Sequence, residues 1–340
     1  MNDYRNILNA AYNKKSSRIP LYEHNVSLKV IGELQHKNLI DMELEERMIQ
    51  YCKFFQEQEY DVVTFEGCVV DMIPGGGALG RHQDGCIKTM EDFKKYPWEE
   101  VLEIYKSSYD RQFAMLQKHM PQGMKGIGGI GNGVFEVVQD LVGYEELCYI
   151  KVDDEELYRC LFQRVGSLLL EIWDWFLEKY PDLYAVCRIG DDMGFKTGLL
   201  LSDEDIKKYI VPEYKVIIQK IHNSQKPFLL HSCGKIFDIM PDMIEAGINA
   251  KHSNEDQIAP FTYWVERYGN QIGNFGGFDT DVICRYGEQE LKEYITDVFL
   301  HCKDKKGIAL GSGNSIPDYV PVENYLIEME TIRELRKQFG

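Results

Sequence analysis

A repeating order of strand, polar or glycine-rich exit and helix constrains the fold of this chain more than any other feature. From residue 61 onward, short apolar runs such as Tyr184–Ile189 and Phe228–Leu230 are followed by polar residues or glycines and then by helical patterns. The unit recurs about seven or eight times, which is typical of a parallel α/β protein. In a chain of 340 residues this order predicts a (β/α)8 TIM barrel with insertions. A doubly wound open sheet is the alternative.

We expect one domain over residues 1–340, in which residues 1–60 form an N-terminal helical segment packed on the barrel. The first strand is predicted at Asp61–Phe65, and the irregular stretch Cys68–Trp98 after it is expected to be an insertion or lid. Gly126–Gly131 matches the G-x-G-x-x-G pattern, but no buried strand is recognisable before it. We therefore interpret these glycines as a close approach of the backbone to a ligand or another strand.

Charge and composition exclude several classes of function. The net charge of −17 argues against nonspecific binding of nucleic acid or of an anionic membrane surface. The sequence has no long apolar run of the kind that spans a membrane. Its polar N-terminus has no signal-peptide core, so a cytoplasmic location is the default expectation. The 9 cysteines are scattered without a C-x-x-C pair, which indicates reduced thiols.

The segment Pro227–Gly234 combines a buried strand with a His-x-Cys exit. Phe228–Leu230 is a continuous apolar run, and His231 and Cys233 follow it. Two side chains so placed can turn toward one point above the strand, and imidazole nitrogen and thiolate sulfur are preferred zinc ligands. A core cysteine beside a hydrogen-bonded histidine is the other interpretation.

Polar side chains also follow the other predicted strands. In a barrel all strand exits lie on one face, so these side chains would surround one mouth. Asp191 and Asp192 could serve as acid or base, bind a cation or cap a turn. The further residues at exits are Glu66, His252, Glu255, Asp279 and Ser312.

Four of these stretches resemble the uroporphyrinogen decarboxylase superfamily, which includes the cobalamin-dependent methyltransferases. They are Gly190–Gly194, Pro227–Gly234, Asn274–Asp279, and Gly311–Asn314 with Pro321 and Glu323–Asn324 downstream. The resemblance spans residues 60 to 335. It implies a barrel with a deep site at its C-terminal mouth and makes a homodimer a reasonable expectation.

The resemblance favours the methyltransferase branch. True decarboxylases carry an arginine-rich stretch near the N-terminus that meets the substrate carboxylates, whereas Leu21–Asn25 has no arginine and its Glu23 would repel them. The methyltransferases hold zinc with the His and Cys of H-x-C-G and a later Cys in a G-C-G step. This chain has His231 and Cys233, but Ser312 stands at the later step. A carboxylate from Glu255, Glu66 or Glu23 would then complete the site.

The resemblance thus implies a zinc-dependent methyltransferase. It would move a methyl group between a corrinoid protein, which carries the methylcobamide, and a small thiol-type acceptor. The implied metal ligands are His231, Cys233 and Glu255. The catalytic candidates are Asp191, Asp192 and Asn314. The substrate-binding candidates are Glu23, His24, Asp279 and Ser312. Two alternatives stay open: a metal-free carboxy-lyase acting on another cyclic or pyrrolic acid, and a non-catalytic barrel that binds a corrinoid or tetrapyrrole.

Overall fold

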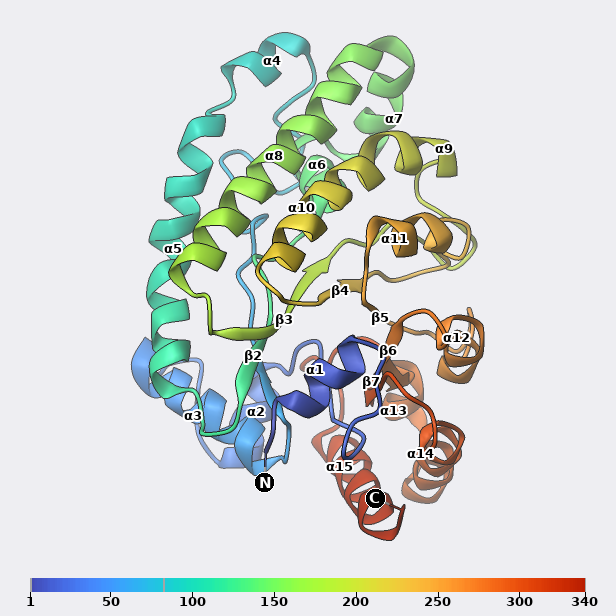
Figure 1. Ribbon diagram of the computed structural model, residues 1–340. Coiled ribbons are helices and arrows are strands. Elements are labelled where there is room, and N and C mark those ends of the chain that lie inside the picture. Colours follow the sequence, from blue (N-terminus) through green and yellow to red (C-terminus); the bar gives the residue numbers. More distant parts are fainter. Residues whose placement is uncertain (1, 82, 340) are drawn as a thin grey trace.

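The computed structural model describes residues 2–81 and 83–339 and shows parallel strands enclosed by helices (Figure 1). The 7-stranded sheet has the order β1-β2-β3-β4-β5-β6-β7, and every pair is parallel. The strands are β1 (Val62–Thr64), β2 (Lys125–Gly128), β3 (Tyr184–Gly190), β4 (Phe228–His231), β5 (Ala250–His252), β6 (Gly273–Phe278) and β7 (Ile308–Ser312).

Three helices precede the first strand, and at least one helix follows every strand of the described residues. The first three are α1 (Arg5–Ala11), α2 (Leu28–Gln35) and α3 (Leu44–Glu57). Between β1 and β4 lie α4 (Met90–Lys95), α5 (Trp98–His119), α6 (Val134–Val142), α7 (Tyr144–Asp153), α8 (Glu155–Lys179), α9 (Asp203–Asp205), the π-helix η1 (Ile206–Ile210) and α10 (Val211–Asn223). The remainder are α11 (Met240–Ala246), α12 (Phe261–Tyr268), α13 (Thr280–Arg285), α14 (Glu288–Cys302) and α15 (Val322–Phe339). None of the described helices is both long and apolar enough to cross a membrane.

An extended N-terminal segment lies between β7 and β1. The amide of Tyr22 donates to the carbonyl of Leu310 over 2.8 Å, and the amide of Leu310 donates to the carbonyl of Pro20 over 3.0 Å. On the other side, the hydroxyl of Thr64 donates to the carbonyl of Glu23 over 2.8 Å. The fold is therefore TIM-barrel-like as expected, with seven strands among the described residues rather than eight, and the N-terminal segment runs beside the last strand.

The glycine-rich motif lies within the sheet, although no strand was recognised there in the sequence. Gly126 and Ile127 belong to β2 and pair with β1 and β3. Gly128 has φ +155°, and a Cβ there would lie 1.8 Å from the carbonyl oxygen of Phe65. The close backbone approach predicted from the motif is thus confirmed, but the partner is a neighbouring strand. Strand β2 contains glycines where β-branched residues normally mark a strand, so its sequence pattern did not predict a strand.

A first layer of apolar side chains fills the barrel at its N-terminal end. It is a buried cluster that includes Val62, Ile127, Val186, Leu229, Ala250, Phe275 and Ala309 from the seven strands. Ile7, Ala10 and Ala11 of α1 and Tyr22 complete the same cluster. Helix α1 therefore covers the N-terminal end of the barrel interior.

Glu328 of α15 is a buried carboxyl group outside the barrel. Its side chain is fully buried, and neither oxygen has a hydrogen-bond partner among the described residues. Burial, reinforced by the nearby charge of Glu23, raises the pKa of Glu328 well above its usual value. Because the folded-state pKa exceeds the unfolded-state pKa, this group lowers stability as the pH rises from the unfolded pKa through the folded pKa.

We expect Glu328→Gln to stabilise the protein more at pH 8 than at pH 5. The variant removes an ionisation that the folded state resists, and the difference between the two gains should be about 1–3 kcal/mol. Urea unfolding at both pH values measures it. Glu330→Gln, an exposed position on the same helix, is the matched control. A gain for Glu328→Gln that does not depend on pH would contradict the expectation.

Candidate metal and substrate site

Strand alternation places three polar side chains above the apolar layer. Side chains two residues apart on a strand point to the same face. Arg188, His231 and His252 follow Val186, Leu229 and Ala250 by two positions, and these three apolar residues belong to the inner cluster. All three polar side chains are buried, so they form the next layer inside the barrel, toward the C-terminal end.

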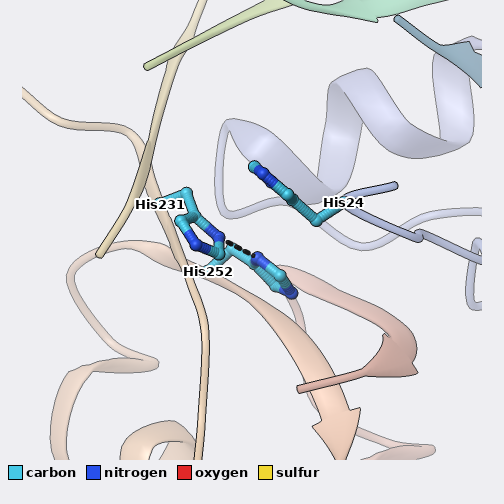
Figure 2. Close-up of side chains that lie close together, drawn as sticks. All are labelled: His24, His231 and His252. Atoms are coloured by element: carbon cyan, nitrogen blue, oxygen red, sulfur yellow. Dashed lines mark hydrogen bonds between the residues drawn. The ribbon is translucent and has the colours of Figure 1, made fainter. Parts of the chain in front are cut away.

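The two histidines on β4 and β5 form a hydrogen-bonded pair, drawn as a dashed line in Figure 2. His252 Nε2 lies 3.2 Å from the carbonyl oxygen of Ser312, and this oxygen can only accept, so Nε2 carries the proton. Burial lowers the pKa of His252 to about 3, so the ring is neutral and its Nδ1 is an acceptor. His231 Nδ1 then donates to His252 Nδ1 over 2.7 Å. The Nε2 lone pair of His231 is therefore free.

That lone pair faces Cys233 and Asp192. Cys233 Sγ lies 3.5 Å and Asp192 Oδ1 lies 3.8 Å from His231 Nε2. The amide of Cys233 donates to Asp192 Oδ1 over 2.8 Å. Ser253 Oγ and Asn314 Nδ2 each donate to Cys233 Sγ over 3.4 Å. Nitrogen, sulfur and carboxylate oxygen thus converge on one point.

The three donors suit a transition metal. Their ligand atoms all lie within 4.8 Å of one another. Zinc bonds of about 2.0–2.3 Å in a tetrahedron place neighbouring ligand atoms roughly 3.3–3.8 Å apart, and Cys233 Sγ and Asp192 Oδ1 lie 3.5 Å and 3.8 Å from His231 Nε2. Burial, followed by the charge of Asp192, raises the pKa of the Cys233 thiol. A free thiolate is therefore disfavoured, which suits a sulfur that is deprotonated by a metal rather than one acting alone.

A second group, His24, His231 and His252, is less suited to a metal. The rings of His24 and His231 are stacked with centroids 3.9 Å apart, and Figure 2 shows them face to face. The Nδ1 atoms of His231 and His252 are already hydrogen-bonded to each other over 2.7 Å. His24 therefore forms a wall of the site, and the Asp192–His231–Cys233 group is the candidate metal site.

Arg188 fixes that wall. Its guanidinium is fully buried and lies 2.7 Å from Glu66 in an ion pair. It also donates to the hydroxyl of Tyr22 over 2.6 Å and to the carbonyl of His24 over 3.0 Å. One buried cation thus ties β3, the exit of β1 and the N-terminal segment together, and sets the position of His24 against His231.

A cavity of about 680 Å³ opens above these groups. Its polar part includes His24, Glu66, Glu136, Asp192, His231 and Asn314, and its apolar part includes Val26, Leu28, Leu44, Met48, Tyr51 and Phe65. This volume is typical of a small-molecule site. The apolar wall comes from the N-terminal helices and the exit of β1, so a bound molecule would lie between them and the polar strand ends.

Three of the predicted site residues, Glu23, Asp191 and Ser312, do not line the cavity. Glu23 accepts hydrogen bonds from the amide of Ser312 over 3.0 Å and from its hydroxyl. Asp191 accepts from the amides of Phe135 and Glu136, at the start of α6, and from the hydroxyl of Tyr214. The catalytic or substrate-binding roles of these three residues stay predictions, and their contacts favour a structural function.

The remaining predicted residues divide between two places. His24, Asp192 and Asn314 line the cavity beside His231 and Cys233. Asp279 caps α13 through the amide of Asp281 and, with Glu255, lines a separate depression. Glu255 is not in either metal-type group of the described residues. The carboxylate beside His231 and Cys233 is that of Asp192.

Two residues of the site were not recognised in the sequence. Glu136 of α6 accepts from the amide of Asp192 over 3.2 Å and from Asn132. Burial and the charges of Asp192 and Asp191 raise its pKa well above the usual value. Arg188 could have been recognised from the sequence. An arginine inside an apolar strand is rarely buried without a charged partner, which indicates a polar group inside the barrel.

Comparison with known proteins identifies relatives of this fold. Residues 66–335 match the family description "Uroporphyrinogen decarboxylase (URO-D)". A methyltransferase from Methanosarcina mazei has a similar structure, with a TM-score of 0.70 and 15% sequence identity over 98% of this chain and 99% of the other. A B12-independent methionine synthase from Shewanella sp. W3-18-1 reaches a TM-score of 0.47 at 9% identity over 67% of each chain. No curated protein matches the sequence.

We expect His252→Asn to weaken metal binding by about 10–100-fold, because the residue that fixes the tautomer of His231 is lost. Cobalt(II) titration, followed by the thiolate-to-metal charge-transfer absorption of Cys233, measures the affinity. His301→Asn, an exposed position on α14, is the matched control. An unchanged affinity in His252→Asn would show that the histidine pair does not orient the ligand.

Proposed function

Because this chain belongs to the uroporphyrinogen decarboxylase family, we propose that it is a zinc-dependent methyltransferase with its site at the C-terminal mouth of the barrel. One observation carries the proposal. His231, Cys233 and Asp192 present nitrogen, sulfur and oxygen to a single point beside a cavity of about 680 Å³. The methyltransferase of similar fold supports the assignment of reaction class.

The site offers a carboxylate in place of the third cysteine that the family resemblance implies. Ser312 is bonded to Glu23 and does not reach the cavity. We propose that Asp192 takes the third ligand position, since its carboxylate oxygen lies 3.8 Å from His231 Nε2. A zinc ion held by these residues would lower the pKa of a substrate thiol and so supply a thiolate nucleophile at neutral pH.

The protein's own residues would organise the reaction around that point. Asn314 and Ser253 donate to Cys233 Sγ and stabilise negative charge on the sulfur. Glu136, whose pKa burial raises, stands next to Asp192 on the cavity wall and would contact a bound substrate. The apolar wall of Leu44, Met48 and Tyr51 would exclude water from a bound methyl acceptor.

A corrinoid protein is the proposed methyl donor, and a small thiol is the proposed acceptor. The cavity opens at the strand exits, which is where a partner carrying methylcobamide would dock. The acceptor would occupy the cavity itself, whose volume matches a small molecule.

The second candidate is a metal-free carboxy-lyase. It is favoured by two arginines on the cavity wall, Arg47 and Arg188, which could hold substrate carboxylates. Arg188 is already paired with Glu66, so Arg47 would have to hold most of the negative charge. This candidate predicts carbon dioxide release that persists in the presence of a chelator.

We expect purified protein to hold about one zinc per chain and Cys233→Ala to lose it, since loss of a thiolate ligand leaves a weak site. Metal analysis by mass spectrometry measures the content. Methyl transfer from methylcobalamin to a panel of thiols should fall at least about 100-fold in the variant.

Cys68→Ala is the matched control, because Cys68 lines the same cavity but belongs to neither metal-type group of the described residues. It should retain zinc and methyl transfer. Equal zinc loss in both variants, or wild-type protein without zinc after growth in zinc, would refute the proposal.

A further inference from the structure

A second cavity, of about 230 Å³, lies at the opposite end of the barrel. It is bounded by the segment 14–19 after α1, the end of α14 with the turn that follows it, the start of β7 and the end of α15. Figure 1 shows α14 and α15 side by side here, close to the C-terminus. The candidate metal site lies at the other ends of the strands, so the two cavities are separate.

The lining of this cavity is strongly basic in a chain whose net charge is −17. Its cationic residues are Lys14, Lys15, Arg18, Lys303, Lys305 and Arg336. Asp304 is the single carboxylate among the described residues that line it. This local excess of positive charge, against the sign of the whole chain, indicates a site for an anion.

Carboxylates neutralise only half of these cations. The ion pairs are Arg18–Asp61 at 2.7 Å, Lys303–Asp304 at 2.8 Å and Lys305–Glu266 at 2.8 Å. Lys14, Lys15 and Arg336 have no carboxylate of the described residues within 4.0 Å. Three of the lining cations therefore have no carboxylate partner within the part of the chain that the structure describes.

Arg336 gives the second, independent observation. Its side chain is a cavity wall and is 9% exposed. Nη2 donates to the carbonyl of Ile19, while Nε and Nη1 are buried without a partner among the described residues. Burial, and next the charge of Arg18, lowers the pKa of Arg336 to about 10. Buried cationic donors without acceptors are costly, and the negative charge of an anion beside this guanidinium would offset part of that cost.

The ends of two helices offer another explanation for the lysines. Helices α14 and α15 end at Cys302 and Phe339, and basic side chains stabilise helix C-termini without any ligand. This effect accounts for exposed lysines such as Lys305. It does not account for Nε and Nη1 of Arg336, which are buried without an acceptor among the described residues.

We propose that this cavity binds phosphate or diphosphate, either free or as the end group of a larger molecule. Three cations without a carboxylate partner among the described residues match the charge of such an anion, and one of them, Arg336, is a guanidinium, the group that best fits phosphate oxygens. The volume of about 230 Å³ is below the roughly 300–1,000 Å³ of sites that enclose a drug-sized ligand. Only the phosphate groups would be enclosed.

The test is calorimetric titration with pyrophosphate, and separately with inorganic phosphate and ADP, at constant ionic strength. We expect saturable binding of pyrophosphate and a rise in Tm. The double variant Lys14→Gln with Lys15→Gln should bind at least about 10-fold more weakly, and Arg336→Met should abolish binding. If ADP binds as tightly as pyrophosphate, the ligand is the phosphate end group of a larger molecule. If ADP does not bind, the ligand is a small free anion.

Lys94→Gln with Lys95→Gln is the matched control, since both lysines are exposed on α4, away from this cavity (Figure 1). It makes the same change in charge and should bind pyrophosphate as the wild type does. The absence of saturable binding, or an equal loss in both double variants, would overturn the proposal. The lysine variants are exposed and should fold even if Arg336→Met does not. No step of this test depends on a metal or on methyl transfer.

Discussion

In a parallel barrel, consecutive side chains on a strand point alternately into the barrel and toward the helices. The candidate site of this protein depends on that constraint. Above the apolar layer, the inward positions hold Arg188, His231 and His252, and Tyr22 and His24 show the same spacing on the N-terminal segment. The outward positions hold Glu23, Asp191 and Ser312, which bond to each other or to α6 instead.

The properties of the inner layer follow from burial combined with a single backbone acceptor. The carbonyl of Ser312 sets the proton position on His252, and His252 in turn leaves Nε2 of His231 unprotonated. The side chain of Ser312 binds Glu23 on the other face of the strand. Ser312 thus supports the candidate metal site through its main chain, although the family resemblance implies a cysteine at this step.

Much of the fold could be predicted from patterns that depend on local sequence. The apolar runs at Tyr184–Ile189 and Phe228–Leu230 became β3 and β4. The position of β2 could not be predicted, because Gly126 and Gly128 are required by contacts with neighbouring strands rather than by local propensity. The count of seven strands also depends on pairing. The N-terminal segment beside β7 forms only isolated bridges, such as that between Leu21 and Leu310, and so is not a strand.

For the site, the sequence alone determined the two donors of the His-x-Cys exit. Side chains two residues apart in extended chain point to the same side, and this brings His231 and Cys233 together. It also determined that the polar residues gather at strand exits. Only the tertiary structure decided which carboxylate joins them. Strands β3 and β5 both pair with β4. Asp192 meets His231 because it lies two residues beyond Gly190, the partner of His231, whereas Glu255 lies three residues beyond His252 and lines another depression. Local spacing sets neighbours along a strand, but neighbours across strands are set by register, which no single segment of the sequence contains.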